Sequence, residues 1–197
     1  MSDPETLNAY SKRADDYEAM VSRAAPDRDL QDFIDGIPKG GRVLDLGCGP
    51  GNSAAAMVAA GLITEAWDAT PEMVSIAQKT PGVDVRLARF EDLNCTGQFD
   101  GIWSNFALLH APRADMPSNL DRITQALKPN GFLHIGLKTG SGEKRDAIGR
   151  FYSYFLEDEL REMLVSRGFE VTYTRHGSQV GLDGTESPFI ILKARLK

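Results

Sequence analysis

Three glycines at alternate positions follow an acidic residue in the segment RVLDLGCGPG, residues 42–51. The apolar residues of this segment predict a short strand that contains Asp45 and leads into Gly47, Gly49 and Gly51. The small residues that follow predict a helix. A strand, a glycine turn and a helix bring bare backbone close to a ligand, because residues without Cβ leave room for it at a helix N-terminus. The carboxylate adds a fixed negative charge, which favours a ligand with a cationic or hydroxyl-rich part.

This segment resembles motif I of the class I S-adenosylmethionine-dependent methyltransferases, (D/E)-x-G-x-G-x-G, with Asp45 and the three glycines in the matching positions and Cys48 inside the turn. The same segment also fits the dinucleotide-binding fingerprint G-x-G-x-x-A, with Gly49, Gly51 and Ala54 in its three fixed positions. Asp68 lies near the usual offset of roughly 20 residues for a ribose-binding acid. Glycine spacing alone therefore leaves methyl transfer and hydride transfer open.

Strand and helix patterns alternate from residue 42 onward. Strands are expected at 42–46, 63–67, 83–87, 99–104 and 131–137, and helices at 52–60, 71–79, 115–127 and 156–167. Such alternation predicts an α/β fold, a Rossmann-like three-layer sandwich with a mainly parallel sheet.

The last two expected strands, 169–175 and 188–195, are joined by a polar loop over 176–187 without a helix. A connection without a helix joins antiparallel neighbours, because a parallel return requires a crossover. A seven-stranded sheet with a terminal antiparallel hairpin is typical of the methyltransferase family, whereas the dinucleotide fold does not require it. This order favours methyl transfer.

The whole chain, 1–197, is expected to form a single methyltransferase domain, with an N-terminal helical lid at 1–40 and a sheet core at 41–197. Helices are predicted at 8–22 and 27–37, and helical spacing would place Tyr10, Arg13 and Tyr17 on one face. Tyr10, Ala14 and Tyr17 are similar to a segment that covers the site in small-molecule methyltransferases. The resemblance implies contact with the carboxylate of the cofactor; packing of the aromatics on the sheet is the alternative.

Ligands of open α/β sheets lie beyond the carboxyl ends of the strands. The resemblance therefore implies that Asp68 binds the ribose, although Asp68 could instead cap the next helix, a role that Thr70 also fits. Arg89 stands where many family members have an acid, so the adenine contact falls to its neighbours. The expected cofactor-binding set is Tyr10, Arg13, Tyr17, Asp45, Gly47, Cys48, Gly49, Gly51, Asp68, Ala69, Met73, Phe90, Glu91, Asn105, Phe106 and Ala107.

His110 follows the fourth strand and is the one histidine expected at the active edge, which makes it the candidate general base and a substrate contact. Segment 138–154 mixes cations with aromatics at the same edge. From it, Lys138, Arg145, Arg150 and Tyr152 are expected to contact substrate, with a solvated loop as the alternative. No metal-ligand spacing is found.

The implied reaction moves a methyl group from S-adenosylmethionine to an O, N, S or C atom of a small molecule. An NAD-dependent oxidoreductase is the alternative enzyme, but the Tyr-x-x-x-Lys pair that it would need is missing near the fourth and fifth strands. The alternative among proteins that are not enzymes is a module that binds an adenosyl ligand without catalysis.

A formal net charge of −6 and a pI near 5.1 argue against binding to nucleic acid or anionic membranes, which needs basic patches. Cys48 and Cys95 do not form a disulfide framework, which indicates a reducing compartment. With no targeting segment or bilayer-length apolar run expected, the protein is predicted to be cytoplasmic, as a monomer or homodimer.

Overall fold

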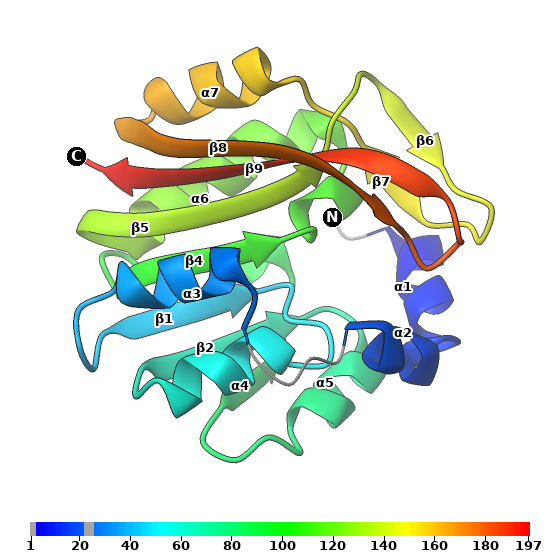
Figure 1. The fold of residues 1–197 in the computed structure, drawn as a ribbon, viewed down its shortest axis with the longest axis horizontal. Coiled ribbons are helices and arrows are strands. Elements are labelled where there is room, and N and C mark those ends of the chain that lie inside the picture. The colour runs from blue at the N-terminus through cyan, green and yellow to red at the C-terminus, as the bar shows by residue number, and fades with distance from the viewer. Residues whose placement is uncertain (1–2, 22–25) are drawn as a thin grey trace.

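The computed structural model describes residues 3–21 and 26–197. Its main sheet has seven strands in the order β3-β2-β1-β4-β5-β9-β8 (Figure 1). The strands are β1 (Arg42–Leu46), β2 (Ile63–Asp68), β3 (Asp84–Leu87), β4 (Phe99–Asn105), β5 (Leu127–Lys138), β8 (Phe169–Val180) and β9 (Glu186–Leu196). The first five are parallel, while β9 runs antiparallel to both of its neighbours. The predicted sheet with its terminal antiparallel pair is confirmed.

Helices cover both faces of this sheet. On one face lie α3 (Arg28–Asp35), α4 (Asn52–Ala59) and α5 (Pro71–Ala77); on the other lie α6 (Met116–Ala126) and α7 (Glu157–Val165) (Figure 1). Side chains that alternate along a strand serve the two layers in turn. In β1, Val43 packs in the α3 cluster, whereas Leu44 joins the cluster that includes α6 and α7. Strand β1 is therefore buried on both faces and carries the glycine turn on a rigid support.

The N-terminal segment forms two short helices, α1 (Pro4–Ser11) and α2 (Ala14–Val21), and we call these two helices the lid. The prediction of one helix over 8–22 is wrong at this point, because the chain turns at Lys12 and Arg13. Asp3 begins α1 by accepting the Thr6 N–H at 2.8 Å. The lid packs on α5 through a small apolar cluster of Ala14, Met73 and Ile76, with Tyr10 and Tyr17 against it.

Two further strands, β6 (Glu143–Arg145) and β7 (Phe151–Ser153), pair antiparallel after β5. The sequence did not predict this hairpin, since its strands are only three residues long. The predicted loop over 176–187 is also largely wrong, because β8 continues to Val180 and β9 begins at Glu186. In Figure 1 the far ends of β8 and β9 extend past the sheet toward β7 and α1. This extension is rich in polar residues because a two-stranded ribbon beyond the sheet leaves part of each of its faces exposed to solvent.

Within the described residues, no helix is long and apolar enough to cross a bilayer. Both cysteines are unpaired, with Cys48 buried and Cys95 half-buried.

Candidate functional site

A pocket opens at the carboxyl ends of β1, β2 and β4, beneath the lid. It encloses about 670 Å³, part of which is open to solvent. Twelve residues expected at the site line it: Tyr10, Tyr17, Gly47, Gly49, Asp68, Ala69, Met73, Phe90, Asn105, Phe106, Ala107 and His110. Segments far apart in the chain therefore meet where the sequence placed the cofactor and the substrate.

Other expected residues lie outside the lining of this pocket: Arg13, Asp45, Cys48, Gly51, Glu91, Lys138, Arg145, Arg150 and Tyr152. Arg13 is exposed, because the turn between α1 and α2 directs it away from the tyrosines. Glu91 pairs with Arg89 at 3.8 Å, near the pocket rim. The expectation that these two side chains contact the cofactor is not supported by where they lie.

The lining also contains residues that were not in the expected site set: Asp3, Thr6, Leu7, Leu46, Trp67, Thr70, Ala88 and Arg89. Leu46, Trp67 and Ala88 stand at or next to the last positions of their strands, so the strand-end rule would have found them. The three residues from α1 and its cap carry no motif, and only the folded lid brings them to the pocket.

The glycine turn has two separate roles. Gly47 and Gly51 allow close packing, because a Cβ on them would lie 2.2 Å from Ala107 Cβ and 3.0 Å from Ala77 Cβ, respectively. Gly49 instead faces the pocket and the lid, with its nearest neighbour, Tyr17 Cε1, 3.3 Å from the position of a Cβ. Its φ of +53° lies in the left-handed region that favours glycine. Gly49 therefore brings bare backbone to the pocket.

Asp68 ties the turn after β1 to the end of β2. Its Oδ2 accepts the Gly49 N–H at 2.9 Å, and its Oδ1 accepts the Thr70 N–H at 2.8 Å. The Thr70 side chain makes no cap bond to α5, so the expectation that Thr70 replaces Asp68 in capping is wrong. Burial raises the pKa of Asp68, while these two N–H groups oppose the rise. Each carboxylate oxygen has further lone pairs that a ligand hydroxyl can use.

Asp45 lies beneath the turn, almost fully buried, and its Oδ2 has no hydrogen-bond partner among the described residues. Burial, with a smaller effect of the Asp68 charge, raises the pKa of Asp45 to about 8. A buried charge without a partner is costly, and the raised pKa reduces this cost because the carboxyl stays neutral near pH 7.

The raised pKa of Asp45 predicts a stability effect. Between pH 4 and 8 the folded protein keeps a proton that the unfolded chain has lost, so the free energy of unfolding falls as pH rises. The slope from this group is at most about 1.4 kcal/mol per pH unit. Asp45→Asn should therefore gain stability relative to wild type between pH 5 and 7.5, measured by urea unfolding at each pH. Parallel curves for the two proteins would contradict the assignment.

His110 connects the lid to the β6–β7 hairpin. Its Nδ1 lies 2.7 Å from the Phe151 carbonyl oxygen and its Nε2 lies 2.9 Å from the Tyr10 hydroxyl. Because a carbonyl only accepts, Nδ1 carries the proton and Nε2 accepts from Tyr10. Arg150 Nη1 also donates to the Tyr10 hydroxyl, at 3.1 Å. Burial lowers the pKa of His110 to about 3, so the imidazole is neutral near pH 7.

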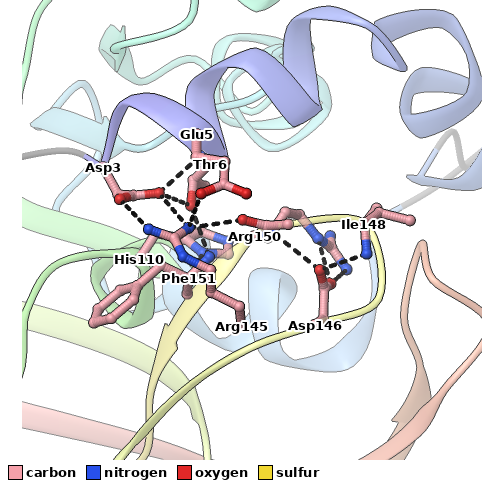
Figure 2. Close-up of polar contacts among 10 residues, drawn as sticks. Asp3, Glu5, Thr6, His110, Arg145, Asp146, Ile148, Arg150 and Phe151 are labelled. Atoms are coloured by element: carbon pink, nitrogen blue, oxygen red, sulfur yellow. Dashed lines mark hydrogen bonds and ion pairs between the residues drawn. The ribbon is translucent and has the colours of Figure 1, made fainter.

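Arg145 ties the hairpin to the lid and does not face the pocket. Its guanidinium donates to both Asp3 oxygens, at 2.9 and 2.8 Å, and lies 3.2 Å from Glu5 (Figure 2). This pairing lowers the pKa of Asp3 far below its usual range. The expectation that Arg145 contacts substrate is therefore not supported. Thr6 adds a second link, because its Oγ1 accepts the Phe151 N–H at 2.8 Å.

Asn105 ends β4 at the pocket wall, where His134 fixes its amide. The Asn105 Oδ1 lies 3.1 Å from His134 Nε2, which donates because an amide oxygen only accepts. The next residue, Phe106, has a φ of +57°, which is uncommon for a bulky side chain. Its N–H donates to the Gly136 carbonyl at 2.9 Å, which holds this conformation. Strained backbone of this kind clusters at functional sites.

The lid has little stability of its own, which predicts a ligand-dependent change. Both helices are eight residues long and bury only Thr6, Ala9 and Ala14, and short helices depend on what they pack against. Amide hydrogen exchange in residues 4–21 should be fast without S-adenosylhomocysteine and slower with it, whereas α6 should be unchanged as the control. Equal protection of the lid in both states would show that it is fixed structure.

The chain is similar to known methyltransferases in sequence and in structure. Residues 43–131 match a family profile described as a methyltransferase domain. The chain is 35% identical over 103 residues to a ubiquinone biosynthesis O-methyltransferase of Xanthomonas oryzae pv. oryzae, covering 49% of this chain and 42% of that protein. It is 38% identical over 73 residues to a trans-aconitate 2-methyltransferase of Mycolicibacterium gilvum, covering 36% and 28%. The matches thus span less than half the length of these relatives.

A similar solved structure is the 1,6-didemethyltoxoflavin-N1-methyltransferase of Burkholderia thailandensis, with bound 1,6-didemethyltoxoflavin and S-adenosylhomocysteine. Its TM-score is 0.79 at 22% identity, over 98% of this chain and 88% of that one, which shows a shared fold. The motif after β1, the strand order and the matched domain agree. In these three features the chain is similar to the class I S-adenosylmethionine-dependent methyltransferases, and residues 43–131 carry the match to the methyltransferase domain.

Proposed function

We propose that this protein transfers the methyl group of S-adenosylmethionine to an O, N, S or C atom of a small molecule. The observation that carries the proposal is the Gly49 turn at the carboxyl ends of β1 and β2. The Asp68 carboxylate holds this turn, and Tyr10 and Tyr17 of the lid lie over the same pocket. In this proposal the chain forms one domain. Of the described residues in the expected lid at 1–40 only α1 and α2 cover the pocket, whereas α3 packs on the sheet and belongs with the core at 41–197.

The residues of the pocket fit the cofactor. Asp68 would hold the ribose hydroxyls with its remaining lone pairs. Asp45 lies outside the pocket lining and its raised pKa keeps it neutral near pH 7, so it is not assigned to the cationic end of the ligand. Met73 and Phe90 supply apolar lining for the adenosine, and Asn105 lies where the methionine part is expected. When bound, the cofactor supplies an electrophilic methyl group on a sulfonium sulfur.

The protein's task is then to hold the acceptor atom near that methyl group and to exclude water. The lid excludes water, because Tyr10 and Tyr17 close over the pocket with ring centroids 5.2 Å apart. In this closed state the Nε2 of His110 is engaged by Tyr10. His110 can accept a proton from the acceptor only through the Tyr10 hydroxyl or after Tyr10 moves away. We therefore assign His110 first to positioning Tyr10.

A small-molecule acceptor is favoured by the similar proteins, which are named for ubiquinone biosynthesis, trans-aconitate and 1,6-didemethyltoxoflavin. The net charge of −6 supports a partner other than nucleic acid. The two unpaired cysteines support a cytoplasmic location, and a monomer or homodimer remains the proposed assembly.

Turnover tests this proposal directly. The protein with labelled S-adenosylmethionine and a panel of small phenols, amines, thiols and organic acids should release S-adenosylhomocysteine in an acceptor-dependent way. Tyr10→Phe, which loses only the hydroxyl, should slow this release. Cofactor binding without turnover on any acceptor would favour a non-catalytic adenosyl-binding module.

A further inference from the structure

Two buried cations lie next to the pocket, on the side of His110. Lys138 is the last residue of β5, and Arg150 precedes β7; they are 7% and 2% exposed. Both lie against the Tyr152 ring, with Lys138 Nζ 3.9 Å and Arg150 Cζ 5.2 Å from its centroid. The same ring lies 4.7 Å from the His110 ring, which lines the pocket.

The charge of Arg150 is compensated. Its Nε and Nη2 each lie 2.8 Å from Asp146 Oδ2 (Figure 2). Asp183, from the turn between β8 and β9, lies 3.8 Å from the same guanidinium. Arg150 Nη1 donates to the Tyr10 hydroxyl. These contacts explain Arg150 as a residue that holds the hairpin, the β8–β9 turn and the lid together.

Lys138 is different. Within residues 3–21 and 26–197 its ammonium has no hydrogen bond and no carboxylate within 4 Å, and it lies over the Tyr152 ring. Asp183 and Asp146 act on it only from a distance, and an Asp183 oxygen instead accepts the Thr185 N–H at 3.2 Å. Burial and the Arg150 charge together lower the pKa of Lys138.

A buried charge is expensive unless it is paired and hydrogen-bonded. Leucine or methionine would fill the same space at the end of β5 without that cost. The position is also linked to the pocket through neighbouring residues: Lys138 pairs with Phe189 in the β5–β9 ladder, and the Phe189 ring contacts Phe106, which lines the pocket. The cation therefore lies one aromatic residue away from the pocket lining, on the side of His110.

We propose that Lys138 binds a carboxylate of the methyl acceptor, so that the acceptor is a small organic acid. The proposal rests on the proposed function. A monoanionic group fits better than a phosphate, because one lysine supplies the free charge and two carboxylates, Asp146 and Asp183, stand nearby. The Tyr152 and Phe106 rings suit an apolar or aromatic body attached to that carboxylate.

Thermal unfolding separates this role from a structural one. Lys138→Met keeps the length of the side chain and removes the charge, so it should raise the melting temperature without ligand. Arg150→Met should lower it, because Asp146 would lose its partner. Lys144→Met, on the exposed strand β6, should leave it unchanged. A lower melting temperature for Lys138→Met would show that the ammonium supports the fold and would overturn the proposal.

Binding gives the second test. Calorimetry with S-adenosylhomocysteine is performed first, and then benzoate and salicylate are titrated into the wild-type complex beside benzamide and salicylamide. We expect the acids to bind more tightly than the amides, and to lose at least about tenfold in affinity in Lys138→Met, the scale of a charged hydrogen bond. Lys144→Met should match wild type.

Equal affinity of the acids for wild type and Lys138→Met, or failure of both acids to bind the wild-type complex, would overturn the anion site. Failure of S-adenosylhomocysteine to bind wild type would instead count against the proposed function, so the two failures are distinguishable.

Discussion

Gly49→Val should abolish binding of S-adenosylmethionine and S-adenosylhomocysteine. A Cβ at this position would stand 3.3 Å from Tyr17 Cε1, and the branched methyl groups of valine would extend into the pocket. Valine also resists the φ of +53° that this residue adopts. The expected result is loss of detectable binding by isothermal titration calorimetry.

Gly97→Val is the matched control, because Gly97 has a φ of +56° and nothing within 4 Å of an added Cβ. It carries the same backbone strain away from the pocket. If Gly49→Val were as stable as Gly97→Val and were still stabilised against heat by S-adenosylhomocysteine, the ligand would not lie against the Gly49 turn.

Asp68→Ala should weaken cofactor binding by about 1.5–3 kcal/mol, the scale of hydrogen bonds to a charged group. The structure adds a second cause, because alanine would also leave the N–H groups of Gly49 and Thr70 without their acceptor. The binding loss should therefore come with some loss of stability, measured by urea unfolding of the ligand-free protein.

Asp100→Ala is a suitable control, since Asp100 also accepts a backbone N–H, from Arg42 at 2.8 Å, but stands at the opposite end of the sheet. It should lose stability without losing cofactor affinity. Unchanged affinity in Asp68→Ala would remove this carboxylate from the site.

The sheet and the cofactor end of the pocket could be predicted from the sequence because their signals are local. Buried parallel strands are continuous apolar runs, and the rule that ligands lie at strand ends turns that pattern into positions. Asp68 and Asn105 follow directly from it, and both line the pocket. The motif after β1 is also a local signal, since its alternate glycines permit the left-handed backbone conformation of the turn.

The lid and the acceptor side could not be predicted because their partners are remote in the chain. Asp3 and Arg145 are 142 positions apart, and no pattern in either segment indicates the other. Helical spacing placed Arg13 beside the tyrosines, but the turn between α1 and α2 moved it to the surface. The short strands of the β6–β7 hairpin gain their stability from tertiary contacts, which propensity does not report.

Calorimetry on the wild-type protein tests most directly whether the pocket beneath the lid binds an S-adenosyl ligand for methyl transfer. S-adenosylhomocysteine, S-adenosylmethionine and NAD are titrated separately under the same conditions. Both S-adenosyl ligands should bind saturably with one site per chain, and NAD should show no measurable binding. Saturable binding of NAD without binding of S-adenosylhomocysteine would contradict an S-adenosyl site.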